Sequence, residues 1–524
     1  MKNQLSLSLV LPPTWLRGLI IILLVLGVFF RFVNLDRKVY WTDETYTSLR
    51  LVGYQIGQVS QYIFDGKTIG IDDLQKYQIL DSEKGLRDTI RVLAVEDSQH
   101  PPLYYIMTRW WVQCWGDSIM VTRSISALLS LLAFPCIYWL CLELFRTPLV
   151  GWISVALIAV SPLHILYAQE AREYGWWTVT ILLSSAAFLS ATRLGTKLSW
   201  SLYTLTLIIG LYTFPFTALV AIGHGFCLLV NEGFKLSQTF KKYVLASLVG
   251  LVAFSPWLWV SVIGITNISN STSWTSESIP ILSLVKIWIL NLTRAFLDVE
   301  FDISNPLTYL ILPIVILVGY SIYYLCRTSP QRVWLFLLLL IGLTAAVLVL
   351  PDLILGGRRS TPPRLLMPTY LGIQIAVAYL FADQISKGSL SNRGQKIWSI
   401  MMVLILTIGI ISDLNYLQAK TWWNKYKSND NFEITKIINN TNKPLIISDN
   451  YSVGDALSLS YYLDPKVKLQ FMRTPQLPRK INGYSDVFVF NPSKELVKTL
   501  QEKYNILSTY NNQFKLLKLA DKSL

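Results

Sequence analysis

The stretch LRGLIIILLVLGVFFRFVNLDRKVYWTDETYTSLR, residues 16–50, joins a long apolar run to two adjacent acids. Residues 16–35 can cross a bilayer, because a transmembrane helix needs about 20 apolar residues. The run is too long for a signal peptide and lacks a small-residue cleavage site, so we expect it to remain as an anchor. Asp43 and Glu44 follow shortly after its end. Carboxylates at a membrane border are costly to desolvate, so a functional reason for this pair is expected.

The composition indicates a multi-pass membrane protein. The chain has 524 residues, of which 52% are hydrophobic and 15% charged, too few charges to cover a soluble chain of this length. We expect about eleven transmembrane helices, at 16–35, 121–145, 149–167, 174–192, 199–214, 215–231, 243–262, 305–326, 333–351, 364–382 and 397–413. Two runs are short, and 199–231 is expected to form a helical hairpin broken at Pro215.

Basic residues predict which loops face the cytoplasm. The net charge of +14 would suggest nucleic acid in a soluble protein, but here the positives lie mostly in short loops. We therefore interpret them as topology signals and lipid contacts, with no nucleic-acid partner. Arg146, Arg193 and Arg332 belong to the set that the positive-inside rule places in the cytoplasm. The opposite, extracytoplasmic side then carries the segments 36–120, 166–174, 263–304, 352–363 and everything after 413.

The tail is predicted to be a small soluble α/β domain on that outer side. PLIISDN (444–450), VKLQF (467–471), DVFVFNP (486–492) and FKLLKL (514–519) read as strands. SKELVKTLQEKYN (493–505) reads as an amphipathic helix capped by Ser493. We therefore expect a transmembrane catalytic domain at 1–413, including an outer loop at 36–120 with interfacial helices, and an α/β domain at 414–524.

Asp43 and Glu44 form the first of three groups of polar residues that stand out, all in outer segments. They precede TYTSLRLVGYQIGQVSQYIF, residues 45–64, which has the apolar spacing of a helix lying along a surface. A purely structural alternative is that Asp43 caps this helix and Glu44 favours its dipole.

The second group lies in VEDSQHPPLYYIMTRWWVQCWG, residues 95–116. Pro101 and Pro102 suit the entry to a helix, and the helix from Leu103 to Trp115 is too short to span and rich in aromatics. We expect it to lie in the membrane interface. The alternative is a mere anchoring helix. The polar residues at its mouth that we expect to line a pocket or to bind are Glu96, Asp97 and His100.

The third group lies in SPLHILYAQEAREYGWW, residues 161–177, a tight turn between two spans. It contains Glu170, Arg172 and Glu173, flanked by Tyr167 and Tyr174. The turn could be a simple ion-paired structure. Alternatively, Arg172 could meet a phosphate, because a guanidinium fork matches phosphate oxygens well.

A fourth, weaker group is GGRRSTPPRLLMP, residues 356–368, which places Arg358, Arg359 and Arg364 outside, against the inside bias. A polyanionic head group or simple solvation of the loop would each explain these charges. The five cysteines show no C-x-x-C spacing and only three histidines occur, which excludes a disulfide framework or a zinc site.

Outer carboxylates, arginines and an interfacial aromatic helix together favour group transfer from a lipid phosphate. A carboxylate can accept the proton of an attacking hydroxyl while cations hold the departing phosphate. Neither a G-x-x-x-x-G-K-[ST] motif nor a G-x-G-x-x-G after a strand occurs, so no nucleotide site is expected. The alternative from another class is a transporter or flippase of a lipid-linked sugar, which predicts inverted repeats and charges at mid-membrane. A catalytically inactive sugar-binding membrane protein is a third option.

The order of three motifs resembles the GT-C superfamily of membrane glycosyltransferases. These are WTDE at 41–44, HPPLYY at 100–105 and YAQEAREY at 167–174. More narrowly, the chain is similar to bacterial members of glycosyltransferase family 39, whose relatives are the protein O-mannosyltransferases and the lipid A aminoarabinose transferases. The resemblance covers about residues 15–200, and RLLMPTYLG from Arg364 is similar to a later family motif.

The resemblance implies an inverting transferase that takes a sugar from a polyprenyl-phosphate donor to a hydroxyl on a protein, lipid or polysaccharide, in the bacterial plasma membrane. It implies Asp43 as general base with Glu44 beside it, and Glu170 as the acid of the second outer loop. Relatives carry Lys where this chain has His100, and Arg364 would lie near the lipid phosphate together with Arg172. Some superfamily members use a divalent metal and others do not, so a metal is possible.

Overall fold

The computed structural model describes residues 14–81, 83–302, 304–386, 392–449, 453–473, 483–509 and 516–521. The chain divides into two compact units. The first, called the bundle unit, consists of Met1–Val33, Asp97–Tyr104 and Arg123–Gln418. The second, called the sheet unit, consists of Asn34–Glu96, Tyr105–Thr122 and Ala419–Leu524.

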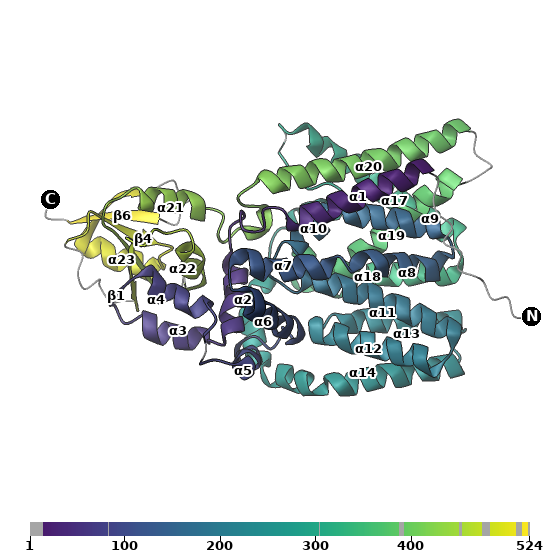
Figure 1. Cartoon of the computed structure of the whole chain (residues 1–524), viewed down its shortest axis with the longest axis horizontal. Coiled ribbons are helices and arrows are strands. Elements are labelled where there is room, and N and C mark those ends of the chain that lie inside the picture. Colours follow the sequence, from purple (N-terminus) through teal and green to yellow (C-terminus); the bar gives the residue numbers. More distant parts are fainter. Residues whose placement is uncertain are drawn as a thin grey trace, which may run out of the picture. The chain divides into compact units, whose positions relative to one another are not determined.

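Long apolar helices dominate the chain (Figure 1). Among the described residues, eight helices are long and apolar enough to cross a membrane, or nine if the bent pair α9 (Pro148–Ala159) and α10 (Pro162–Ala168) is one span. This confirms a polytopic α-helical membrane protein. The eight spans are α1 (Thr14–Phe32), α7–α8 (Ile119–Ser130 and Ala133–Phe145), α11 (Tyr174–Leu194), α14 (Gln238–Ile263), η3–α17 (Pro306–Leu310 and Ile311–Thr328), α18 (Gln331–Leu355), η4–α19 (Pro363–Leu366 and Met367–Ser386) and α20 (Asn392–Gln418).

Two expected spans are shorter than the rest. The runs at 199–214 and 215–231 form α12 (Lys197–Thr213, 17 residues) and α13 (Thr217–Asn231, 15 residues), with a break beside Pro215 as expected. Length therefore accounts for the difference between about eleven expected helices and the eight or nine that qualify in the described part of the chain. The remaining helices of the bundle unit are α15 (Ile265–Thr272), η2 (Ser273–Ser276) and α16 (Ile281–Thr293).

The helix is bent by 60° between α9 (Pro148–Ala159) and α10 (Pro162–Ala168), and the carbonyls at the end of α9 lose the donors that a continuous helix would supply. The buried guanidinium of Arg31 satisfies two of them, donating to Ala159 O at 2.9 Å and Ile158 O at 3.1 Å. Such replacement partners are needed because a membrane interior supplies no water to a broken helix. Gly27, one turn before Arg31, lets α1 approach this bend, since a Cβ there would lie 2.6 Å from Ala159 O.

The sheet unit is a mixed six-stranded sheet with helices on both faces. Its strand order is β1-β3-β2-β4-β6-β5; β2, β3 and β4 run parallel, and the other neighbouring pairs are antiparallel. The strands are β1 (Thr68–Ile69), β2 (Pro444–Asp449), β3 (Lys468–Met472), β4 (Asp486–Phe490), β5 (Tyr504–Thr509) and β6 (Leu516–Asp521). Its helices are α2 (Thr42–Val52), α3 (Ile56–Ile63), α4 (Ile71–Gln75), η1 (Lys76–Gln78), α5 (Leu86–Glu96), most of α6 (Leu103–Trp115), η5 (Trp423–Lys425), α21 (Asn431–Asn439), α22 (Val453–Ser460) and α23 (Lys494–Lys503).

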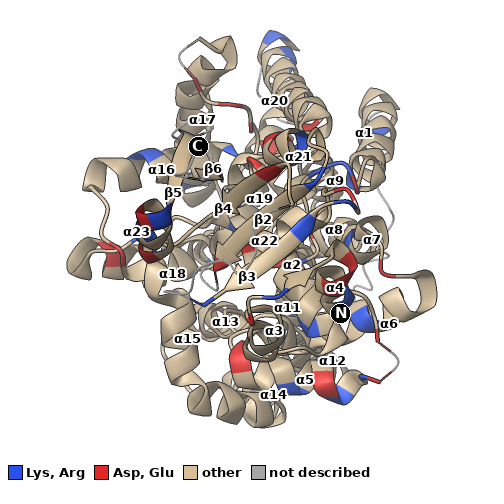
Figure 2. Cartoon of the chain, turned by 90° about the vertical axis from the view of Figure 1, so that its left-hand side faces the viewer, with Lys and Arg blue, Asp and Glu red and all other residues tan. Residues whose placement is uncertain are grey.

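The expected tail elements are confirmed. The four predicted strands correspond to β2, β3, β4 and β6, and α23 begins after Ser493, whose side chain accepts a hydrogen bond from Leu496 N at 3.1 Å. The two-residue β1 and the strand β5 were not expected. Charged side chains colour much of α23, whereas the apolar span α17 is largely tan (Figure 2).

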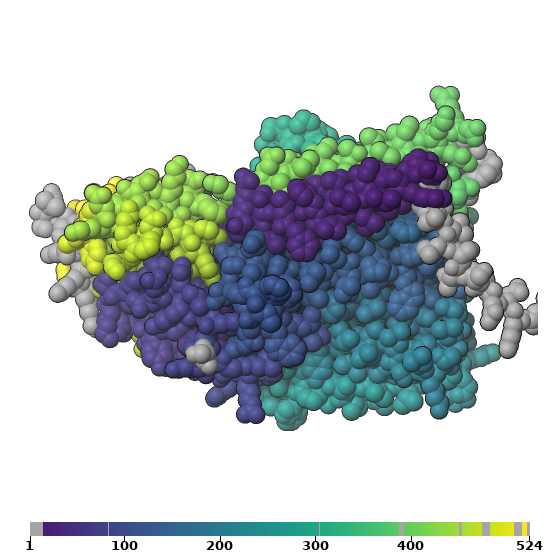
Figure 3. All heavy atoms as spheres, in the orientation of Figure 1, coloured from purple at the N-terminus to yellow at the C-terminus, as the bar shows by residue number. Residues whose placement is uncertain are grey.

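Both faces of the sheet are buried because successive side chains of a strand point to opposite faces. On β2, Leu445 and Ile447 join the core covered by Leu496 and Leu500 of α23. Ile446, between them, joins a larger core on the other face, with residues from α2, α3 and α22. The atoms of residues 55–96 lie directly against those of the tail (Figure 3). Residues between Leu49 and Tyr77 and residues of the tail from Ile434 onward thus share one hydrophobic core. That the chain forms separate domains on either side of residue 413 stays a prediction.

Candidate active site

The turn between α10 and α11 carries the densest group of charged residues in the bundle unit. Glu170, Arg172 and Glu173 are each at most 4% exposed, and Arg172 N donates to Glu170 O at 2.7 Å, which closes the turn tightly. Gln169 anchors the turn to the end of α1, since its amide donates to Phe30 O and Val33 O at 2.6 and 3.0 Å. The chain leaves the bundle unit at Val33, so the segment that leads to Asp43 starts at this same end of the bundle.

His100 lies between Arg172 and Glu173. Its Nδ1 is 2.7 Å from Glu173 Oε1, and its Nε2 is 3.1 Å from an Arg172 NH2 group. A guanidinium can only donate, so Arg172 is the donor toward Nε2. His100 therefore lies in contact with both charged neighbours. Asp97 is more distant, with Oδ2 at 3.9 Å from His100 Nε2.

Glu173 is a buried carboxylate held in its charged form. Burial alone would raise its pKa, but the nearby Arg172 guanidinium and the contact with His100 outweigh this effect and lower the pKa of Glu173 to about 2. Arg172 NH2 lies 3.6 Å from Glu173 Oε1. The carboxylate of Glu173 therefore offsets the charge of the Arg172 guanidinium, but the two groups do not form a bidentate ion pair.

Two arginines converge on the ring of Tyr174. The guanidinium carbons of Arg172 and Arg364 lie 5.7 and 5.6 Å from its centroid, and Tyr167 packs edge-on against it at 5.5 Å between centroids. Cations stack on aromatic faces, and two of them near one ring favour an anion between or beside them. The predicted phosphate-binding residues Arg172 and Arg364, and the predicted pocket tyrosines, are thus brought together in the bundle unit.

The other arginines of the fourth group have other partners. Arg359 is paired with Asp352, with NH1 at 3.2 Å from Oδ1. Arg358 lies 3.6 Å from Glu277 and stacks over Trp274. Of the three arginines at 358–364, Arg364 is therefore the one that joins the cluster around Tyr174.

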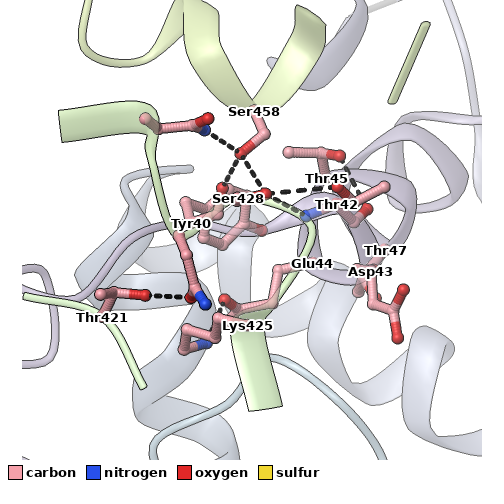
Figure 4. Close-up of polar contacts among 12 residues, drawn as sticks. Tyr40, Thr42, Asp43, Glu44, Thr45, Thr47, Thr421, Lys425, Ser428 and Ser458 are labelled. Carbon is pink, nitrogen blue, oxygen red and sulfur yellow. Dashed lines mark hydrogen bonds and ion pairs between the residues drawn. The ribbon is translucent and has the colours of Figure 1, made fainter. Parts of the chain in front are cut away.

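Asp43 and Glu44 lie in the first turn of α2, in the sheet unit, and have different surroundings. Glu44 is fully buried and lies 3.0 Å from Nζ of the buried Lys425, which also stacks over Trp41. Asp43 is partly exposed, and its carboxylate points away from this pair (Figure 4). The geometry assigns Glu44 to holding α2 in place and leaves Asp43 facing outward.

The first turn of α2 is fixed on both sides of Asp43. Thr42 donates through its hydroxyl to Asp455 Oδ1 at 2.8 Å. Its backbone N–H donates to Ser428 Oγ at 3.3 Å (Figure 4). Ser458 Oγ in turn donates to Ser428 Oγ at 3.1 Å. On the other side, Glu44 is held by Lys425. Asp43 therefore occupies a backbone position determined by the tail.

The structure also tests the alternative that Asp43 serves only to cap its helix. The helix begins at Thr42 and its N-cap is Trp41, with no side-chain capping bond. Asp43 is inside the first turn, so it is not the cap. Glu96, expected near His100, instead accepts from Ile56 N at 3.0 Å and Gly57 N at 3.4 Å at the start of α3.

Sequence reasoning omitted three residues that the contacts single out. Glu173 was noticed in the turn but given no role, although it holds His100 and Arg172. Lys425 and Asp455 carry no motif and lie far along the chain, 381 and 413 residues from their partners in α2. A signal existed for Glu173, because it directly precedes the first residue of a membrane span. Lys425 and Asp455 had no such signal in the sequence.

A metal has no assigned place in this arrangement. Among the described residues, no group of three or more His, Cys, Asp or Glu side chains is arranged to hold a metal ion.

The fold and the cluster define a polytopic membrane protein with acids and arginines gathered at one end of its helices and a partly exposed acid on an α/β unit. Comparison with solved structures finds the same fold in two proteins. ArnT from Cupriavidus metallidurans bound to undecaprenyl phosphate aligns over 96% of this chain and 98% of its own, at 12% identity and a TM-score of 0.51. Its apo state aligns over 97% and 98%, at 11% identity and a TM-score of 0.52.

The second protein is the oligosaccharyltransferase of Archaeoglobus fulgidus in its apo form. It aligns over 88% of this chain and 65% of its own, at 12% identity and a TM-score of 0.50. No protein-family model and no curated protein matches the sequence. These likenesses concern the fold alone, and they confirm the expected polytopic helical architecture with a small α/β part.

Proposed function

We propose that the chain is an inverting membrane glycosyltransferase that moves a sugar from a polyprenyl-phosphate donor to a hydroxyl acceptor. The observation that carries the proposal is the convergence of Arg172 and Arg364 on Tyr174, in a cluster set by His100 and Glu173. Two guanidiniums suit a lipid phosphate whose negative charge grows as the sugar leaves. The shared fold with ArnT, which was solved bound to undecaprenyl phosphate, supports a donor of the same chemical kind.

In the proposed reaction, the acceptor oxygen forms a bond to the anomeric carbon as the bond from that carbon to the phosphate oxygen breaks. The acceptor's proton moves to the carboxylate of Asp43, which acts as general base. The polyprenyl phosphate departs with the bonding electrons, and Arg172 and Arg364 stabilise its charge. Attack from the face opposite the phosphate inverts the anomeric centre.

The proposal places this chemistry on the extracytoplasmic side of a bacterial plasma membrane, as the basic loops indicate. Two features favour a transferase over a transporter. The cluster lies at the N-terminal end of α11, at the border of a span, whereas a transporter is expected to bind its substrate near the middle of the membrane. The partly exposed Asp43 belongs to the sheet unit, which is separate from the helices of the bundle unit.

The test is sugar transfer by purified protein in detergent micelles, using a panel of radiolabelled short-chain prenyl-phosphate sugars and membrane extract as acceptor. A transferase forms product without two compartments, whereas a flippase does not. Asp43→Asn should lower turnover by 10²–10⁴-fold, the typical contribution of a positioned base. Asp36→Asn, an exposed acid of the same loop, is the matched control and should keep wild-type turnover.

Thermal melts should show equal stability for both variants. Wild-type turnover in Asp43→Asn would shift the role of base to another acid, with Glu170 the next candidate. Absence of any sugar transfer by wild-type protein with every donor, together with donor movement across vesicle bilayers, would favour the flippase.

A further inference from the structure

A second cluster of arginines surrounds a pocket in the bundle unit that the proposed reaction does not use. The pocket has a volume of about 250 Å³ and lies where the C-terminal ends of α8, α11 and α13 meet the start of α18. Liquid water takes about 30 Å³ per molecule, so the space can hold a small polar head group. Its floor is apolar and includes the buried side chains of Leu144, Phe188 and Val333.

The rim of this pocket is basic. Arg146, Arg193 and Arg332 line it and are exposed, with Glu143 as the acid among the lining residues. Glu143 forms an ion pair with Arg193, whose Nε and NH2 groups lie 2.9 and 2.6 Å from its two carboxylate oxygens. The NH2 group of Arg146 is farther from Glu143 Oε2, at 4.0 Å. Among the described residues, no acid forms an ion pair with Arg332. The rim therefore carries excess positive charge.

The pocket lies at the opposite membrane border from the His100 cluster. Glu173 directly precedes the first residue of α11 and Arg193 is in its last turn. A helix of 21 residues is about 30 Å long, which matches the hydrocarbon thickness of a bilayer. Arginines at this level reach the head-group region, where basic pockets between helices bind anionic lipid heads.

We propose that this pocket binds the phosphate head of an anionic glycerophospholipid. Arg146 and Arg332 contact the phosphate, and the apolar floor receives the glycerol and the start of the acyl chains. A free phosphate ion would keep its water shell and gain nothing from the apolar floor. A zwitterionic lipid lacks the net charge that the rim attracts. The pocket therefore binds a lipid at the membrane border opposite the proposed active site.

The test uses full-length protein in nanodiscs of equal parts phosphatidylglycerol and phosphatidylcholine, with a photoactivatable phosphatidylglycerol probe. Crosslinks should map to the ends of α8 and α13. Each arginine removed should weaken probe labelling about fivefold, so Arg146→Gln with Arg332→Gln should lose about 25-fold. Lys396→Gln, an exposed cation near the start of α20, is the matched control and should label as wild type.

Labelling by a phosphatidylcholine probe should be the same in all variants, and melting in pure phosphatidylcholine nanodiscs should show that the double variant is folded. Equal phosphatidylglycerol labelling in the double variant and the wild type would overturn the proposal. Displacement of the probe by inorganic phosphate, or preferential displacement by a polyprenyl phosphate, would also overturn it and assign the pocket to that ligand.

Discussion

At the residue scale, Glu44 lies 3.0 Å from Lys425 Nζ inside the sheet unit, whereas its neighbour Asp43 points outward. The sequence singles out both acids because a carboxylate pair beside a membrane span needs a reason. It does not separate them, because the partner of Glu44 is 381 residues away. The same limit applies to His100: the motif predicts its place in the site, but only the structure gives its contacts with Arg172 and Glu173.

Glu173 should make the stability of the protein depend on pH in the acid range. Its pKa is lowered from an ordinary value of 4.5 to about 2 by Arg172 and His100 against the opposing effect of burial. The stabilisation is therefore complete above about pH 4.5 and is lost as the pH falls toward 2. We expect the melting temperature of the wild type to fall more steeply below pH 4.5 than that of Glu173→Gln.

Melting curves in detergent between pH 3 and pH 7 measure this difference. Glu300→Gln, an exposed acid in the bundle unit, is the control and should follow the wild type throughout. Parallel curves for wild type and Glu173→Gln would show that the carboxylate titrates as in the unfolded chain.

At the scale of elements, helix α2 depends on the tail for its position. Lys425→Met should leave Glu44 as a buried charge without its cation and destabilise the sheet unit by about 3–5 kcal/mol, because desolvation is then uncompensated. The double variant Glu44→Gln with Lys425→Met removes the charge and should recover most of this loss. Lys427→Met, at an exposed position of the same segment, should have little effect.

Thermal melts of the wild type, Glu44→Gln, Lys425→Met and the double variant form a double-mutant cycle, and sugar transfer gives a second readout. If α2 positions Asp43, turnover in Lys425→Met should fall below the wild type even at temperatures where the variant is folded, and recover in the double variant. A stability loss under 1 kcal/mol in Lys425→Met would mean that the pair is not a buried charge pair in solution.

The elements of the fold were predicted with uneven success, for physical reasons. Short apolar runs bounded by polar or turn residues predict β2, β3, β4 and β6, and the Ser493 cap predicts the start of α23. The two-residue β1 carries no pattern of its own and exists because Thr68 pairs with Gln470. β5 is interrupted by an irregularity between Ile506 and Ser508, which breaks the alternation. Pairing between distant segments, unlike local periodicity, leaves no trace in a single sequence.

At the scale of the whole molecule, the predicted topology places the tail outside the cytoplasm. In a variant with all five cysteines replaced, Lys498→Cys on α23 should react with a membrane-impermeant thiol reagent on intact spheroplasts. Lys396→Cys should react only after lysis, because it lies near the start of α20 among the cytoplasmic loops. The reverse pattern would invert the topology and move the proposed site to the cytoplasmic side.

The shared core of the sheet unit has a consequence for biosynthesis. Thr68 of β1 pairs with Gln470 of β3, so the outer loop cannot complete its sheet until the ribosome has made nearly the whole chain. At about 5–20 residues per second, the intervening 402 residues take roughly 20–80 s. During that interval the apolar faces of α2 and α3 have no tail to cover them. The newly made loop must therefore rest on the bilayer surface or on a chaperone while the remaining spans are inserted.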